Sequence, residues 1–126
     1  MMIIKSYTDI EQSKKLAEIL PIESADMRYA PFGDTHPWVW NEEVKLLEKG
    51  SIPCWSLAAL LEIIPKNIEA INRLRIDIDN VDFSIWYDDL NGYGVNDKLP
   101  DITSKEPVDA CYEMVLKLHE LNLLQS

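Results

Sequence analysis

The chain has 126 residues, of which 47% are apolar, and its 12 Lys and Arg residues against 22 Asp and Glu residues give a formal net charge of −10. This length suits one domain with a sizeable core, and the apolar fraction is too high for a disordered tail. The apolar runs are broken well before the ~20 residues that a membrane span needs, and the negative charge repels nucleic-acid phosphates and anionic lipids. We therefore expect a single domain over residues 1–126 that binds neither membranes nor nucleic acid.

Two helices are predicted in the first half of the chain. Thr8 and Glu11 match a capping box, and the apolar positions after them stop at a proline, which predicts a helix at about residues 8–20. Residues 30–37 are rich in Pro, Gly and Asp and predict a loop. Residues 41–49 begin with Asn, carry Glu early and Lys late, and are followed by Gly, an order that predicts a second helix.

Two longer apolar helices are predicted further along the chain. Residues 53–64 repeat apolar side chains at helical spacing and are followed by a proline. Residues 105–122 also repeat apolar side chains at helical spacing, with Ser104 as the expected cap and a proline in the first turn. Cys54 and Cys111 fall on these apolar stripes, so we expect buried, inert thiols. They make neither a disulfide framework nor a zinc motif.

Between about residues 72 and 88 the apolar period changes from helical to two, which predicts a β-hairpin. A two-residue turn at positions 79–80 pairs Ile76 with Phe83 and gathers the apolar side chains on one face. That face consists of Leu74, Ile76, Ile78, Val81, Phe83 and Ile85. A third strand is expected around residues 93–95. The fold class predicted is α+β, with a small antiparallel sheet covered by amphipathic helices.

Groups suited to catalysis are few. Asp34 and His36 form the one close pair of carboxylate and imidazole in a loop. The segment Asp88–Asp97 is rich in oxygen donors and bent by glycine, but an EF-hand template started at Asp89 puts Tyr93 at a ligand position and fails. We therefore expect no metal and no cofactor. A small hydrolase-like or metal-dependent enzyme with a site near Asp34, His36 and Asp88–Asp97 is the alternative function.

An aromatic cluster formed by Phe32, Trp38 and Trp40 lies beside the turn-rich loop. Aromatic side chains are enriched where protein interfaces concentrate binding energy. A small domain with four tryptophans must also bury most of them, so packing in the core is the other interpretation. We take Phe32, Trp38 and Trp40 as candidate partner-binding residues.

Three stretches carry a resemblance to a known group of proteins. They are residues 11–27 (EQSKKLAEILPIESADM), 52–65 (IPCWSLAALLEIIP) and 107–114 (PVDACYEM). Together they resemble short uncharacterised proteins of phages, prophages and mobile elements of gut bacteria. The group has no known activity, cofactor or catalytic residue, so the resemblance implies a genomic setting only. Accessory proteins in that setting often act by binding a host or phage protein.

The first residues show no basic leader followed by a long apolar run, which favours a cytoplasmic location. The sequence thus predicts an acidic cytoplasmic accessory protein of phage or mobile-element type. We expect it to act by protein–protein binding without catalysis. The partner is unidentified, and the sequence leaves open whether the protein forms a homo-oligomer.

Overall fold

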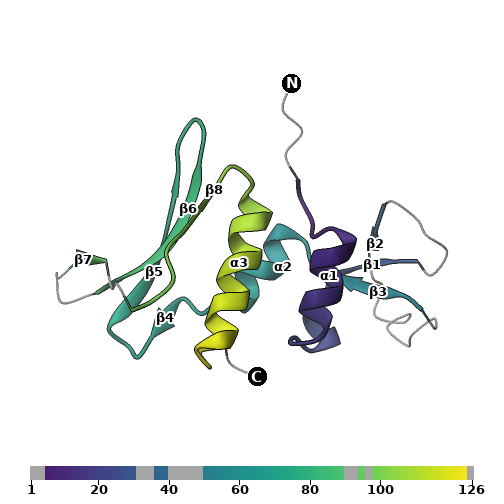
Figure 1. Ribbon diagram of the computed structural model, residues 1–126, viewed down its shortest axis with the longest axis horizontal. Coiled ribbons are helices and arrows are strands. Elements are labelled where there is room, and N and C mark those ends of the chain that lie inside the picture. The colour runs from purple at the N-terminus through teal and green to yellow at the C-terminus, as the bar shows by residue number, and fades with distance from the viewer. Residues whose placement is uncertain (1–4, 31–35, 40–49, 90–93, 96–97, 125–126) are drawn as a thin grey trace.

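The structure is a computed structural model that describes residues 5–30, 36–39, 50–89, 94–95 and 98–124. Within this part of the chain, two antiparallel sheets lie at opposite ends of the molecule and three α-helices lie between them (Figure 1). The fold is α+β, as the sequence predicts. The helix expected at residues 41–49 lies outside the described residues, as do Phe32, Asp34 and Trp40.

The first helix, α1 (Ile10–Ala17), starts one residue later than its sequence signal indicates. Asp9, rather than Thr8, is the cap: its carboxylate accepts a hydrogen bond from the Gln12 N–H, and the Gln12 side chain accepts one from the Asp9 N–H. This reciprocal pair satisfies two N–H groups that a helix start leaves unpaired. Thr8 is instead fully buried. A short 3₁₀ turn, η1 (Ile22–Ser24), follows α1.

The smaller sheet has the strand order β2–β1–β3, with β1 (Met27–Tyr29) in the centre, β2 (Trp38–Val39) on one side and β3 (Ile52–Cys54) on the other. The prediction of a helix from residue 53 is wrong at its start, because β3 pairs with β1 there. Pro53 fits an outer strand, since it lacks the N–H that a central strand needs. The helix α2 (Leu57–Ile63) begins only after Ser56, whose hydroxyl caps it.

The larger sheet is built around one central strand, β6 (Phe83–Asp89). On one side of β6 lies β5 (Asn72–Ile78), which in turn pairs with the two-residue β4 (Asn67–Ile68). On the other side lie β7 (Gly94–Val95) and β8 (Ile102–Ser104). β7 agrees with the third strand expected near residue 95.

The β5–β6 hairpin has the predicted apolar face but a different register. Ile76 lies opposite Ile85, so the predicted pairing of Ile76 with Phe83 is wrong by two residues. The cause is a four-residue turn, in which the Asp79 carboxylate accepts hydrogen bonds from the N–H groups of Val81 and Asp82 at 2.8 and 2.7 Å. A shift of two residues keeps every side chain on its predicted face.

The last helix, α3 (Pro107–Glu120), packs against α2, β6 and β8 (Figure 1). Just after the end of α3, Asn122 has a positive φ of 59°, which lets the Leu123 N–H bond back to the Leu118 carbonyl. One cluster of buried side chains joins the three helices to β6; its largest members are Trp55, Tyr87, Leu16, Leu60, Ile64, Ile85, Met114 and Leu118. Cys111 belongs to this cluster, and Cys54 is buried beside it on β3. Burial of both thiols is therefore confirmed.

The helices cover the apolar face of the larger sheet unevenly. Ile85 and Phe83 on β6 are 0% and 4% exposed, whereas their partners on β5, Ile76 and Ile78, are 42% and 72% exposed. The main contacts of α3 with this sheet are to β6 and β8. The hairpin extends beyond the helices (Figure 1), which leaves the second half of β5 uncovered.

Candidate functional site

The structure places Trp38, one of the candidate partner-binding residues, on the surface. Trp38 lies opposite Arg28 and Val39 lies opposite Met27 in the pairing of β2 with β1, so their side chains point to opposite faces of the small sheet. Trp38 is 61% exposed and Val39 is 80% exposed. Of the two interpretations of the aromatic cluster, the structure thus supports the exposed one for Trp38. Phe32 and Trp40 lie outside the described residues.

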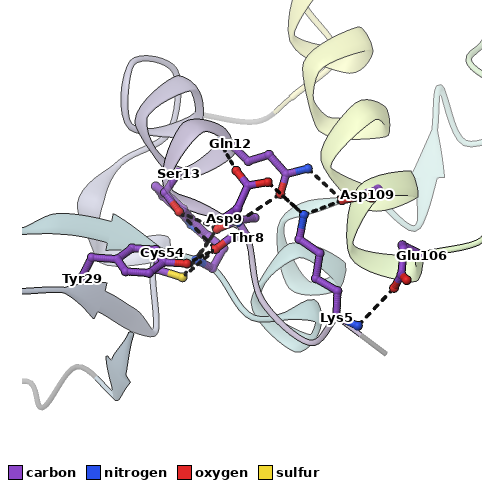
Figure 2. Close-up of polar contacts among 10 residues, drawn as sticks. Lys5, Thr8, Asp9, Gln12, Ser13, Tyr29, Cys54, Glu106 and Asp109 are labelled. Atoms are coloured by element: carbon purple, nitrogen blue, oxygen red, sulfur yellow. Dashed lines mark hydrogen bonds and ion pairs between the residues drawn. The ribbon is translucent and has the colours of Figure 1, made fainter. Parts of the chain in front are cut away.

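A buried polar cluster fastens this sheet to α1 (Figure 2). The Tyr29 hydroxyl on β1 donates a hydrogen bond of 2.7 Å to the Thr8 carbonyl, and the Cys54 thiol lies 3.4 Å from the same oxygen. The Thr8 and Ser13 hydroxyls lie 2.8 Å apart. All four side chains are buried, so the cluster positions β1 and β3 against the helix.

The buried polar cluster contains nucleophilic groups, but burial makes them poorly suited to catalysis. Burial raises the pKa of the Cys54 thiol, even though hydrogen bonds with Thr8, Ser13 and Tyr29 favour the thiolate. Burial is also the main reason why the pKa of Tyr29 is raised. A neutral thiol with no access to substrate is a poor nucleophile. We therefore assign the cluster a structural role.

A second polar network joins the start of the chain to α1 and α3 (Figure 2). The Lys5 amine donates to Gln12 and Asp109 at 2.7 Å each and lies 3.2 Å from an Asp9 oxygen. Gln12 also donates to Asp109, at 2.8 Å. Glu106 accepts a hydrogen bond from the Lys5 backbone N–H. The network therefore bridges segments about a hundred residues apart in the sequence.

The charges of this network shift the pKa values of its members in opposite directions. Partial burial alone would raise the pKa of Asp109, but hydrogen bonds from Lys5 and Gln12 and the Lys5 charge lower it. Partial burial would likewise lower the pKa of Lys5, but Asp109 and Asp9 raise it. Both shifts favour the ionised pair. The network stabilises the fold at neutral pH rather than supplying a proton.

A groove of about 500 Å³ lies between the end of α2 and β5. Leu61, Lys66, Leu74 and Ile76 contribute to its walls. The Lys66 amine donates hydrogen bonds to the carbonyls of Leu61 and Ile64 and so caps the C-terminus of α2. Asn67 and Arg73 complete the lining, so the groove has both apolar and polar walls.

The alternative prediction was an enzyme site near Asp34, His36 and Asp88–Asp97. Those of its residues that the structure describes do not lie close together. His36 is exposed two residues before β2, whereas Asp88 and Asp89 lie on β6 at the opposite end of the molecule (Figure 1). The Asp88 carboxylate accepts hydrogen bonds from Trp86 and Arg75. Asp34 and most of residues 90–97 lie outside the described part. No group of His, Cys, Asp and Glu suited to a metal ion occurs among the residues that the structure describes.

Comparison with protein-family models, with curated proteins and with solved structures gives no match to the chain. In the described part of the chain, no helix is both long and apolar enough to cross a membrane.

The sequence interpretation missed one exposed feature, the uncovered half of β5. The sequence shows only the charges of its polar face, where Arg73, Arg75, Asp77 and Asp79 occupy every second position. Such alternation marks a polar face whose two halves carry opposite charges. The exposure of Ile76 on the other face had no sequence signal, since it depends on where α3 begins relative to the hairpin.

Proposed function

We propose that the protein acts without catalysis, by binding another protein through a surface that includes Trp38 and Val39. The observation that carries this proposal is the exposure of both side chains of β2, one on each face of the small sheet. β2 is also an outer strand, and no described strand pairs with its far edge. An outer strand with exposed side chains can offer apolar contact and backbone hydrogen bonds together.

The net charge of the protein favours a partner with a basic surface. A formal net charge of −10 favours association with a basic protein surface and speeds the encounter with it. The proposal includes the cytoplasmic, phage or mobile-element setting suggested by the resemblance of residues 11–27, 52–65 and 107–114. Binding a host or phage protein is the kind of activity that such a setting favours.

The test compares Trp38→Ala with the wild-type protein as bait in a pull-down from the native host, followed by affinity measurement with the captured protein. We expect Trp38→Ala to weaken binding about 30-fold or more, since an interface aromatic commonly contributes ~2 kcal/mol. Its melting temperature should change by about 3 °C or less, because surface substitutions rarely cost more than ~0.5 kcal/mol.

Ile71→Ala is the matched control, since Ile71 is an exposed apolar residue between β4 and β5, on the other sheet. It should leave the affinity for the captured protein unchanged. The proposal is refuted if Trp38→Ala binds within about threefold of wild type. A loss of binding that is accompanied by a large drop in melting temperature would point instead to a folding role for Trp38.

A further inference from the structure

The outer edge of β5 is open only beyond Leu74. The last hydrogen bond on that edge joins the Leu74 N–H to the Lys66 carbonyl at 2.9 Å, so Lys66 fills the position opposite Leu74. Successive peptide groups of a strand point to alternate edges, so the N–H and C=O groups of Ile76 and Ile78 point to the same edge as that N–H. No described strand pairs with them there. The edge thus offers two donors and two acceptors beside a position that is already filled.

The chain that precedes Lys66 does not run along this edge. The Pro65 carbonyl accepts a hydrogen bond of 2.6 Å from the hydroxyl of Tyr87. Tyr87 is a buried residue of β6 on the face that the helices cover, and Ile64 is buried in the same core. The chain therefore reaches β4 from the covered face of the sheet. The large exposure of the Ile78 side chain agrees with an accessible edge.

The groove between α2 and β5 opens onto the same stretch of edge, because Ile76 is one of its walls. Leu61 and Leu74 are its other apolar walls, and its volume is about 500 Å³. Two of its described lining residues are charged, and both of them, Lys66 and Arg73, are basic and exposed. The local charge of the groove is thus opposite to the net charge of the protein. It favours an anionic ligand.

Both basic side chains have hydrogen-bond donors left for such a ligand. The Lys66 ammonium has three N–H groups, and it donates to two carbonyls at the end of α2. The Arg73 guanidinium makes no hydrogen bond or ion pair with the residues that the structure describes. Lysine and arginine bind carboxylates through charge-assisted hydrogen bonds. Because open peptide groups and apolar walls lie beside these two cations, the anion that fits is the carboxylate of a peptide.

The positions of the two cations decide the direction of a strand added at this edge. A strand antiparallel to β5 runs toward Lys66, as β4 does, so its C-terminal end meets Lys66 and Arg73. A parallel strand would bring its N-terminal ammonium to the same cations, which repel it. An internal segment of a chain would have to turn away from the edge there, because Lys66 fills the next position. A free C-terminus meets both conditions.

We propose that this edge binds the C-terminal segment of another protein, as a strand antiparallel to β5 whose last residue lies opposite Ile76. The N–H of that residue donates to the Ile76 carbonyl, and the residue two positions earlier exchanges both N–H···O=C bonds with Ile78. Facing residues of paired strands point to the same side of the sheet, so the last side chain enters the groove. Two residues of a strand span roughly 7 Å, which leaves the carboxylate within reach of the Lys66 side chain. The ligand therefore ends in an apolar residue with a free carboxylate.

The probe for this site is a positional-scanning library of pentapeptides labelled with fluorescein at the N-terminus. It is prepared once with a free C-terminal carboxylate and once as C-terminal amides, and binding is measured by fluorescence anisotropy. We expect free acids that end in an apolar residue to bind with dissociation constants of about 1–100 µM. The best acid should bind about tenfold or more tightly than its own amide, because the amide cannot form the hydrogen bonds to a charged acceptor.

Methylation of single peptide nitrogens tests direction and register. A methyl group on the nitrogen of the last residue removes the donor to Ile76 and should weaken binding about tenfold or more. The penultimate nitrogen points away from β5, so its methylation should change the affinity less than about threefold. Hydrogen exchange gives the same information on the protein. The amides of Ile76 and Ile78 should exchange more slowly when the peptide is bound, whereas those of Arg75 and Asp77, which point toward β6, should not change.

Arg73→Gln and Arg75→Gln form a matched pair of variants. Both side chains are exposed and lie on the same face of β5, but only Arg73 lines the groove. Arg73→Gln should weaken the acid about threefold or more and leave the affinity of the amide unchanged, whereas Arg75→Gln should change neither. Lys66→Met should weaken the acid as well. Since Lys66 also caps α2, circular dichroism melts check that this variant is folded, and Arg73→Gln carries the test if it is not.

Three results would overturn the proposal. One is a library of free acids in which no peptide binds at up to about 1 mM. Another is equal affinity of the best acid and its amide. The third is binding of decanoate to the wild-type protein without binding of any peptide, which would assign the groove to a fatty acid. Trp38 lies in the smaller sheet at the other end of the molecule (Figure 1), so Trp38→Ala should bind the peptide like wild type, and this proposal is tested separately from the binding surface at Trp38.

Discussion

The unequal burial of the two strands of the β5–β6 hairpin leads to a prediction about stability. Ile76 and Ile85 lie opposite each other and point to the same face of the sheet, yet Ile85 is fully buried and Ile76 is 42% exposed. Replacing each with Ala removes the same atoms from the same face. The difference between the two variants therefore measures how far the helices cover the hairpin.

The magnitudes follow from the two environments. A buried Ile→Ala change costs about 2–5 kcal/mol, because the lost transfer free energy is increased by the cavity left behind. At Ile76 only part of the side chain is removed from water, and no closed cavity remains, so we expect a cost of about 1 kcal/mol. A gap of about 2 kcal/mol corresponds to a difference in melting temperature of roughly 6–10 °C for a domain of this size.

Urea denaturation followed by circular dichroism measures both free energies of unfolding. Phe83→Ala and Ile78→Ala, at facing positions that are 4% and 72% exposed, should rank in the same order. Equal costs for Ile76→Ala and Ile85→Ala would refute the reasoning, because they would show that the apolar face of β5 is covered as fully as that of β6.

Two further predictions concern the polar network and the thiols. Asp109→Asn should cost about 1 kcal/mol or less at pH 7, since the pair with Lys5 is partly exposed, and urea titrations should show a flatter pH dependence than wild type. The pKa of Asp109 is lowered in the folded protein, so its contribution to the free energy of unfolding is present above the ordinary carboxyl pKa and is lost as pH falls through the lowered pKa. The pKa of Lys5 is raised, so the stability that Lys5 contributes is lost only as pH rises through the raised pKa. Identical pH profiles for the two proteins would contradict this. Cys54 and Cys111 should react with a bulky thiol reagent only after unfolding, because burial raises both pKa values, that of Cys111 to about 12; rapid labelling of the native protein would refute it.

Local signals in the sequence determined much of the fold. The apolar period of two between residues 72 and 88 predicted the hairpin and the side chains that share a face, because alternation is a property of the strand itself. The helical period of residues 105–122 predicted α3 for the same reason. The alternating charges from Arg73 to Asp79 can also be read from sequence alone.

Contacts between distant segments decided the rest. Pro53 and Cys54 carry a helical pattern but lie in a strand, because they pair with Arg28 and Met27 of β1, far earlier in the chain. The register of the hairpin was set by the Asp79 carboxylate in the turn, and a pairing rule based on apolar residues alone cannot detect it. The exposure of Trp38 depends on the extent of the small sheet, and the exposure of Ile76 depends on where α3 begins relative to the hairpin. Burial is a property of neighbouring surfaces, so only the tertiary structure shows which apolar residues are left for a partner.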